Sequence, residues 1–150
     1  MLELWSGGGE RNEEGARSTQ GTGRGGAHAA SRVLVVDDDP SILETVTAIL
    51  VTEGYHVKAA GGGREALALA QTWLPTLVLL DMRMPHMDGW AVARALREHG
   101  ATMPIVVMTA AESARRWADE IGAAGYLAKP FGLDELISCV ERYGTTQRRN

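Results

Sequence analysis

Short apolar runs alternate with stretches of helical periodicity from Arg32 onward, and this alternation constrains the fold more than any other feature. The runs are rich in Val, Leu and Ile and are punctuated by Gly, Pro or Asp, which is typical of buried strands. They are RVLVVD (32–37), YHVKAA (55–60), TLVLLD (76–81), MPIVVMT (103–109) and GYLAKP (125–130). Such strand–helix units in succession predict an α/β protein with a doubly wound, five-stranded parallel sheet covered by helices on both faces.

The local signals agree with this architecture. The uninterrupted apolar runs predict central strands, whereas the more alternating run at 55–60 predicts an edge strand. Asp39 offers a side-chain acceptor and Pro40 follows it, a combination that favours the start of a helix. Gly54 is well placed to end that helix.

The first 31 residues differ in kind from the rest of the 150-residue chain. They are rich in glycine, carry charges of both signs, and contain almost no apolar residue after Trp5. A segment of this composition buries too little surface to offset its ordering entropy, so we expect residues 1–31 to be disordered. The remaining length suits one domain, over residues 32–144, followed by a short tail at 145–150.

Composition excludes several classes of function. The formal charge of −4 gives no broad positive field, so nucleic acid is not an expected direct partner. No apolar stretch approaches the roughly 18 residues that cross a bilayer, and the first residues do not resemble a signal peptide. Cys139 is the only cysteine, which excludes an internal disulfide and fits a reducing, cytoplasmic location.

Polar residues end the apolar runs: Asp37 and Asp38 after the first, Asp81 after the third, Thr109 after the fourth and Lys129 in the fifth. In doubly wound sheets the site lies outside the carboxyl ends of the strands, so we expect these groups to converge. Clustered carboxylates repel one another unless a cation neutralises them. Oxygen-only ligands suit Mg²⁺, with Mn²⁺ as the alternative ion.

In a site of this kind, Asp81 is in a position to act as a nucleophile. Its carboxylate oxygen can accept a phosphoryl group and become an aspartyl phosphate. Mg²⁺ and Lys129 would stabilise the negative charge on the transferred group, and Thr109 would then hydrogen-bond one of its oxygens.

The segments VLVVDDDP, VLLDMRMPHMDG, VVMTA and GAAGYLAKPF together resemble, in this order, the receiver domain of two-component response regulators. The resemblance covers residues 32–144 and implies a flavodoxin-like (βα)5 receiver fold with Asp81 as phosphoacceptor. It further implies that Asp38, Asp81 and the backbone carbonyl of Arg83 bind the metal, and that Asp37 acts through a water molecule.

The same resemblance assigns switch roles. Thr109 would move toward the phosphate and Tyr126 would turn inward, with Lys129 beside the acceptor and a cis peptide bond between Lys129 and Pro130. A sensor histidine kinase would be the donor. The signal would pass to a histidine phosphotransfer protein or an effector through the face of the fourth helix, fifth strand and fifth helix. The chain would act as a receiver-only regulator and not as an enzyme, although a piece of a longer regulator or hybrid kinase fits equally well.

Two other functions remain open from the sequence. VVDDDPS loosely fits the start of a haloacid-dehalogenase-like phosphatase, with Asp37 as nucleophile, Asp39 as acid, and Thr109 and Lys129 as later motifs. Against this, Ser41 stands where Thr or Val is usual and no acidic pair follows the lysine strand. The third hypothesis is a receiver-like binding module that works without phosphorylation, which the complete set of site residues argues against.

Overall fold

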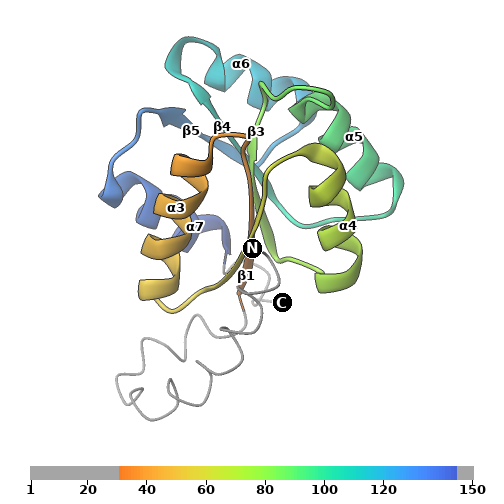
Figure 1. The fold of residues 1–150 in the computed structure, drawn as a ribbon. Helices are drawn as coiled ribbons and strands as arrows, with labels where there is room; N and C mark the ends of the chain where they lie inside the picture. Colours follow the sequence, from red (N-terminus) through yellow and green to blue (C-terminus); the bar gives the residue numbers. More distant parts are fainter. Residues whose placement is uncertain (1–30, 145–150) are drawn as a thin grey trace.

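The computed structural model describes residues 31–144 and shows a parallel sheet with helices on both of its faces (Figure 1). The strand order is β2-β1-β3-β4-β5, which confirms the predicted doubly wound, five-stranded sheet. The elements are β1 (Arg32–Val36), α3 (Pro40–Thr52), β2 (His56–Ala60), α4 (Gly63–Trp73), β3 (Leu77–Asp81), α5 (Gly89–Glu98), β4 (Ile105–Ala110), α6 (Ala111–Ile121), β5 (Gly125–Lys129) and α7 (Leu133–Gly144).

The predicted disordered segment and the predicted tail fall almost wholly outside the described residues. The exception is Ser31, which we expected to be disordered. It is buried, and its hydroxyl donates a hydrogen bond to the carbonyl of Gly144 at 3.1 Å. Ser31 therefore belongs to the packed domain, one residue before the start that we predicted for it.

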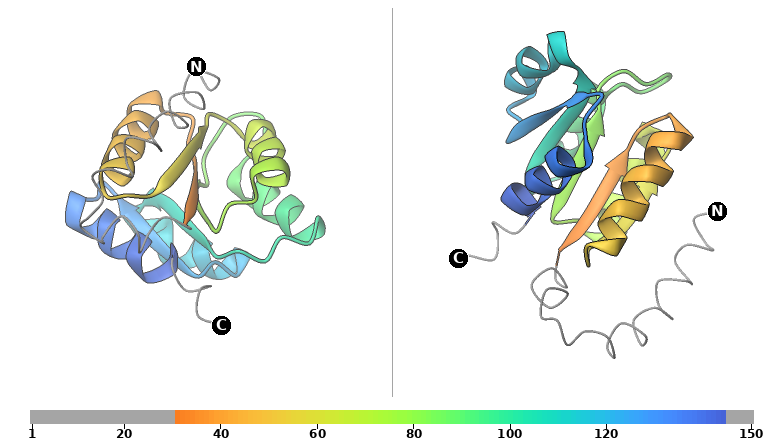
Figure 2. Two further views of the ribbon diagram at one scale, coloured as in Figure 1. Left: turned by 90° about the horizontal axis from the view of Figure 1, so that it is seen from below. Right: turned by 90° about the vertical axis from the view of Figure 1, so that its left-hand side faces the viewer.

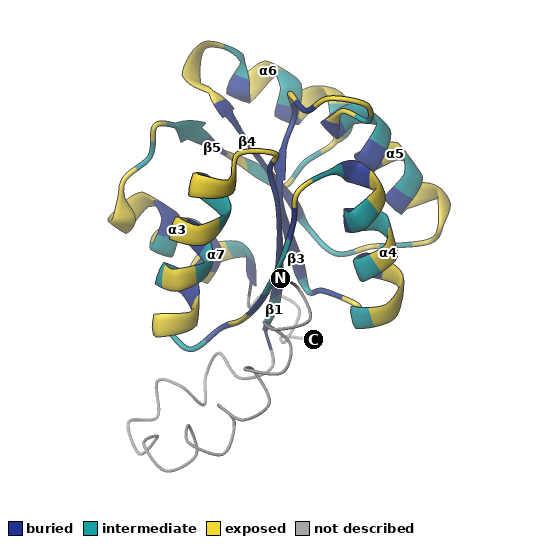
Figure 3. Cartoon of the chain, in the orientation of Figure 1, coloured by how far each residue is buried: buried dark blue, intermediate teal, exposed yellow. Residues whose placement is uncertain are grey.

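The helices form two layers. Helices α3 and α7 cover one face of the sheet, and α4, α5 and α6 cover the other (Figures 1 and 2). Successive strand residues point to opposite faces, so β1 sends Val33 and Val35 to the α3–α7 side and Leu34 and Val36 to the other side. Burial is concentrated in the sheet and on the inward faces of the helices (Figure 3).

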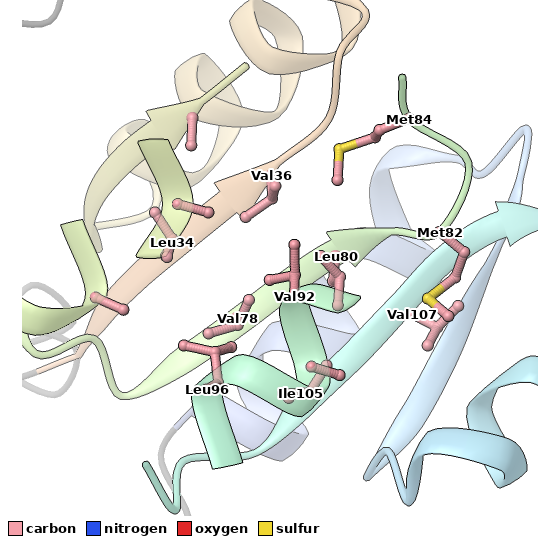
Figure 4. Close-up of a cluster of buried hydrophobic side chains, with 14 of the residues drawn as sticks. Leu34, Val36, Val78, Leu80, Met82, Met84, Val92, Leu96, Ile105 and Val107 are labelled. Carbon is pink, nitrogen blue, oxygen red and sulfur yellow. The ribbon is translucent and has the colours of Figure 1, made fainter. Parts of the chain in front are cut away.

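The larger of the two cores lies under α4, α5 and α6. Apolar residues of β1, β3 and β4 meet Val92 and Leu96 of α5 there, and Met82 and Met84 extend this core beyond the end of β3 (Figure 4). All five residues of β3 are buried, as expected for the central strand of a parallel sheet. The last of these buried residues is Asp81, so a carboxylate lies at the edge of the core, where β3 ends.

Helix ends follow the signals in the sequence. The side chain of Asp39 accepts a hydrogen bond from the backbone amide of Ser41 at 2.9 Å, and Pro40 opens α3. Gly54, just beyond the end of this helix, has a φ of 99°, a conformation that glycine adopts readily. Asp88 caps α5 in the same way as Asp39 caps α3, by accepting from the amide of Ala91 at 3.0 Å.

The 55–60 run forms β2, which is an edge strand as predicted. Among the described residues, none of the helices combines the length and the apolar character needed to span a membrane.

Candidate functional site

The candidate site lies where the strand order reverses. From β1 the chain first builds β2 on one side and later returns to build β3 on the other side. Val36 pairs with Leu80 across these neighbouring strands, so Asp37 and Asp81, the next residues, lie side by side. Both acids are buried, with residue exposures of 0% and 4%. The topology thus places two carboxylates together at the carboxyl edge of the sheet.

A pocket of about 500 Å³ opens above these two acids. Residues that follow or end β1, β3, β4 and β5 line this pocket, together with residues from the first turns of α6. All five residues that the strand ends predicted to converge are among them. The pocket is lined by Asp37, Asp38, Asp39, Asp81, Arg83, Thr109, Ala110, Glu112, Ser113, Trp117 and Lys129.

Lys129 bridges the two buried acids. Its Nζ donates a hydrogen bond to Asp37 Oδ2 at 2.8 Å and lies 3.6 Å from Asp81 Oδ1. The other oxygen of Asp37, Oδ1, accepts from the backbone amide of Asp39 at 3.0 Å. Asp81 Oδ1 accepts a longer bond, at 3.3 Å, from the amide of Arg83. Both oxygens of Asp37 are therefore engaged by donors, whereas Asp81 is held less tightly.

Electrostatics distinguish Asp81 from an ordinary carboxylate. Burial raises the pKa of Asp81 to about 6, and the negative charge of Asp37 contributes in the same direction. The nearby Lys129 and the amide of Arg83 oppose this shift only in part. The ionised form of Asp81 is thus destabilised in the pocket, and an added positive charge would stabilise it.

The ammonium of Lys129 differs from the Asp81 carboxylate, because the pocket favours its charged form. Burial lowers the pKa of Lys129, but its hydrogen bond to Asp37 and the negative charges of Asp37 and Asp81 raise this pKa by more, so it lies above its ordinary value. Lys129 is therefore a permanent positive charge at neutral pH. It can face an anionic group on Asp81 without losing its proton.

The acidic cluster also fits a hard divalent cation. Asp37, Asp38 and Asp81 each offer one carboxylate oxygen, and these three atoms lie within 4.8 Å of one another. Two of the acids are buried and Asp38 is exposed, so the cluster is open to solvent on one side. Oxygen donors with an open side match the preference of Mg²⁺, which keeps several of its waters.

The remaining predicted residues take different places. Thr109 is buried at 3% exposure and lines the pocket from the end of β4. Tyr126 lies on β5 outside the pocket lining and is 47% exposed. The peptide bond between Lys129 and Pro130 is cis.

Arg83 and Trp117 stand out among the lining residues that the strand ends did not predict. Arg83 was expected to bind the metal through its backbone carbonyl; the residue lines the pocket, and its guanidinium carbon lies 5.9 Å from the centre of the Trp117 ring. Trp117 lies on α6, and none of the motifs in the sequence connects it with Arg83. Their contact is a property of the tertiary structure alone.

Comparison with known proteins decides the family of this chain. The model of the response regulator receiver domain matches residues 33–141. The chain belongs to the response regulator receiver domain family. Members of this family are phosphorylation-activated signalling switches and act as regulators more than as enzymes. The assignment from the motifs is thereby confirmed, and neither the phosphatase nor the phosphorylation-independent hypothesis is favoured.

Relatives of this receiver include longer proteins. The response regulator MprA of Mycolicibacterium vanbaalenii is 46% identical over 109 residues, which make up 71% of this chain and 47% of that protein. MprA of Mycobacterium avium is 43% identical over 109 residues, which make up 71% of this chain and 48% of that protein. The chain thus spans about half the length of these relatives.

Solved structures support the same fold. The chemotaxis protein CheY4 of Vibrio cholerae superposes with a TM-score of 0.70 at 34% identity, covering 75% of this chain and 98% of that one. A putative response regulator from Chloroflexus aurantiacus gives a TM-score of 0.71 at 36% identity, covering 75% and 96%. The receiver fold is therefore shared over nearly the whole of these shorter chains.

Proposed function

We propose that this receiver takes a phosphoryl group onto Asp81 from the phosphohistidine of a sensor histidine kinase. A single observation carries the proposal: Asp81 ends a fully buried strand beside a second acid and within 3.6 Å of Lys129. No stability argument favours two buried acids at one strand edge, since each raises the cost of ionising the other. Transfer of a phosphoryl group to Asp81, with a cation bound beside it, would explain why the two acids lie together.

In the transfer step an oxygen of the Asp81 carboxylate attacks phosphorus. The phosphorus–nitrogen bond of the donor breaks, and the leaving imidazole nitrogen keeps the electron pair and takes up a proton. The product is an acyl phosphate on Asp81. Lys129 holds its proton throughout and faces the negative charge that accumulates on the phosphoryl oxygens. Attack of water on the same phosphorus returns the free carboxylate and inorganic phosphate.

Asp38, Asp81 and the backbone carbonyl of Arg83 would hold Mg²⁺ or Mn²⁺, with Asp37 acting through a water molecule. The spacing of the carboxylate oxygens supports this assignment. The bound ion supplies positive charge that neutralises the transferring phosphoryl group. Asp37 contributes in another way as well, because its two hydrogen bonds fix the position of Lys129 and of the Asp39 backbone.

For the response to phosphorylation, Thr109 would donate its hydroxyl to a phosphoryl oxygen, and Tyr126 would turn inward from its exposed position. The burial of Thr109 in the pocket and the 47% exposure of Tyr126 are the observations that support this switch. The surface formed by α6, β5 and α7 would change and would bind a histidine phosphotransfer protein or another effector.

The rival nucleophile, Asp37, is less suitable than Asp81. Its Oδ2 is bound by Lys129 and its Oδ1 by the amide of Asp39, so neither oxygen is available for attack without losing a donor. This arrangement supports Asp81 as the acceptor and speaks against the phosphatase hypothesis.

The test is phosphoryl uptake from acetyl phosphate in the presence of Mg²⁺, measured as the mass of the intact protein. The wild-type chain should gain one phosphoryl group, and Asp81→Asn should gain none. Asp88→Asn is the matched control, because Asp88 is an exposed acid and asparagine also caps helices well. Uptake by Asp81→Asn equal to that of the wild type would refute the proposal.

A further inference from the structure

The side chain of Arg83 is an unusual part of the pocket, because it is exposed and yet has a fixed neighbour. Its guanidinium carbon lies 5.9 Å from the centre of the Trp117 ring, within the range of a cation–π contact. Arg83 and Trp117 both line the pocket that contains Asp81. An exposed arginine ordinarily samples many rotamers, and an aromatic surface of this kind restricts them.

The Trp117 ring is itself held in place. It meets Trp90 of α5 edge to face, with ring centres 4.9 Å apart and planes at 68°. The indole nitrogen of Trp90 donates a hydrogen bond to Glu120 Oε1 at 2.9 Å, which links α5 back to α6. Both rings pack against the core under α4, α5 and α6. The surface that supports Arg83 is therefore anchored on two helices.

The charge of the pocket gives this arrangement a role. Five of the lining residues carry carboxylates, and Lys129 and Arg83 are the two lining residues with permanent positive charge. Lys129 makes its short contact with Asp37. A phosphoryl group would add further negative charge, and the planar guanidinium of Arg83 is suited to donate to its oxygens.

We propose that Trp117 is a positioning residue of the phosphoryl site: it holds the Arg83 guanidinium at the rim of the pocket, where that group donates hydrogen bonds to an anionic phosphoryl group on Asp81. The inference rests on the proposed function and adds to it a residue that acts through Arg83. It also separates two roles of Arg83, because the backbone carbonyl would serve the metal and the side chain would serve the anion.

The test uses beryllofluoride, an anionic phosphoryl mimic, with Mg²⁺ present and its affinity measured by titration calorimetry. Arg83→Gln and Trp117→Leu should each weaken beryllofluoride binding by about fivefold, the size expected of one partly exposed charge-assisted contact. Trp117→Phe should recover part of the loss, because phenylalanine keeps an aromatic face. The losses should shrink at high salt, where exposed charges are screened.

A matched control and a double variant separate positioning from general damage. Arg116 lies 6.0 Å from the same ring but is not part of the pocket lining, so Arg116→Gln should bind beryllofluoride as the wild type does. The double variant Arg83→Gln/Trp117→Leu should bind no more weakly than Arg83→Gln alone, because Trp117 acts through Arg83. Mg²⁺ affinity without beryllofluoride should not be weakened in any variant, because Arg83 and Trp117 contribute no side-chain ligand to the cation.

Two results would overturn the inference: wild-type affinity in Trp117→Leu, or fully additive losses in the double variant. Thermal unfolding of each variant shows whether a loss reflects damage to the fold, and Trp117→Phe provides the milder change in that case. If the wild-type chain itself bound no beryllofluoride, the proposed function would fail as well. Binding by the wild type with unchanged affinity in the Arg83 and Trp117 variants would defeat only the positioning role.

Discussion

Lys129 Nζ lies 2.8 Å from Asp37 Oδ2, a contact between the ends of two strands that are 92 residues apart in the chain. The side chain of Asp37 is 1% exposed and that of Lys129 is 25% exposed. The ammonium therefore has a structural partner in the resting state and lies 3.6 Å from the proposed acceptor at the same time. The stability of the fold and the proposed phosphoryl transfer therefore both depend on the positive charge of Lys129.

Removing this charge should destabilise the metal-free protein. Lys129→Met leaves the buried Asp37 carboxylate without its ammonium, and we expect a loss of about 1 to 3 kcal/mol in the free energy of unfolding by urea in the presence of a chelator. Arg116→Gln is the comparison, because it breaks an exposed pair with Glu120 at 3.9 Å and should cost less than about 0.5 kcal/mol. Equal effects of the two substitutions would contradict the structural role of Lys129.

Asp81 should make stability depend on pH. Its pKa is raised to about 6 in the fold, so the folded state binds this proton more tightly than the unfolded chain does. The stabilising contribution is present below the ordinary carboxyl pKa and is lost as the pH rises through about 6. Without metal at neutral pH, Asp81→Asn should therefore be more stable than the wild type by about 1 to 3 kcal/mol.

The same comparison below the ordinary carboxyl pKa serves as the control, because the wild-type Asp81 is then protonated in both states and the difference should shrink. Thermal unfolding across this pH range measures both limits. A variant that is less stable than the wild type at neutral pH would contradict the raised pKa.

Gly89 should tolerate no side chain. A Cβ at this position would lie 2.7 Å from Met82 Cα and 2.8 Å from the carbonyl oxygen of Asp81. Both are backbone atoms next to the acceptor, so Gly89→Ala should cost about 1 to 3 kcal/mol and should lower phosphoryl uptake as well. Gly61→Ala is the control, because its Cβ would meet only Glu65 Oε1, at an ordinary 3.8 Å. Unchanged unfolding of Gly89→Ala by urea would refute this close approach.

The single cysteine should be inert in the folded protein. Burial raises the pKa of the Cys139 thiol to about 11, and the nearby Arg142 opposes this only in part. The thiolate fraction at neutral pH should be about a hundredfold lower than for an unperturbed thiol, with alkylation slowed in proportion. Iodoacetamide labelling followed by mass spectrometry measures this rate. Equal rates in native buffer and in urea would show that the thiol is not shielded.

Much of the architecture could be predicted because it depends on local patterns. The Asp39–Pro40 pair marks the start of α3, and Gly54 follows its end, as their backbone preferences require. The uninterrupted run that ends at Asp81 became the central strand β3. The convergence of the acids followed from topology, since parallel strands share one carboxyl edge.

The partners of individual side chains could not be predicted in the same way. The sequence indicates that Lys129 meets the acids, but its preference for Asp37 over Asp81 depends on distances set by strand register. The contact of Arg83 with Trp117, and that of Trp117 with Trp90, depends on how α5 and α6 pack. Side-chain contacts between separate elements leave no periodic signal in the sequence.

The identity of the modified carboxylate is the most direct test of the account. The protein is treated with acetyl phosphate and Mg²⁺, the acyl phosphate is reduced with borohydride, and the position of the resulting homoserine is mapped by peptide mass spectrometry. We expect homoserine at position 81 alone. Homoserine at position 37, together with turnover of small phosphate esters, would contradict the account.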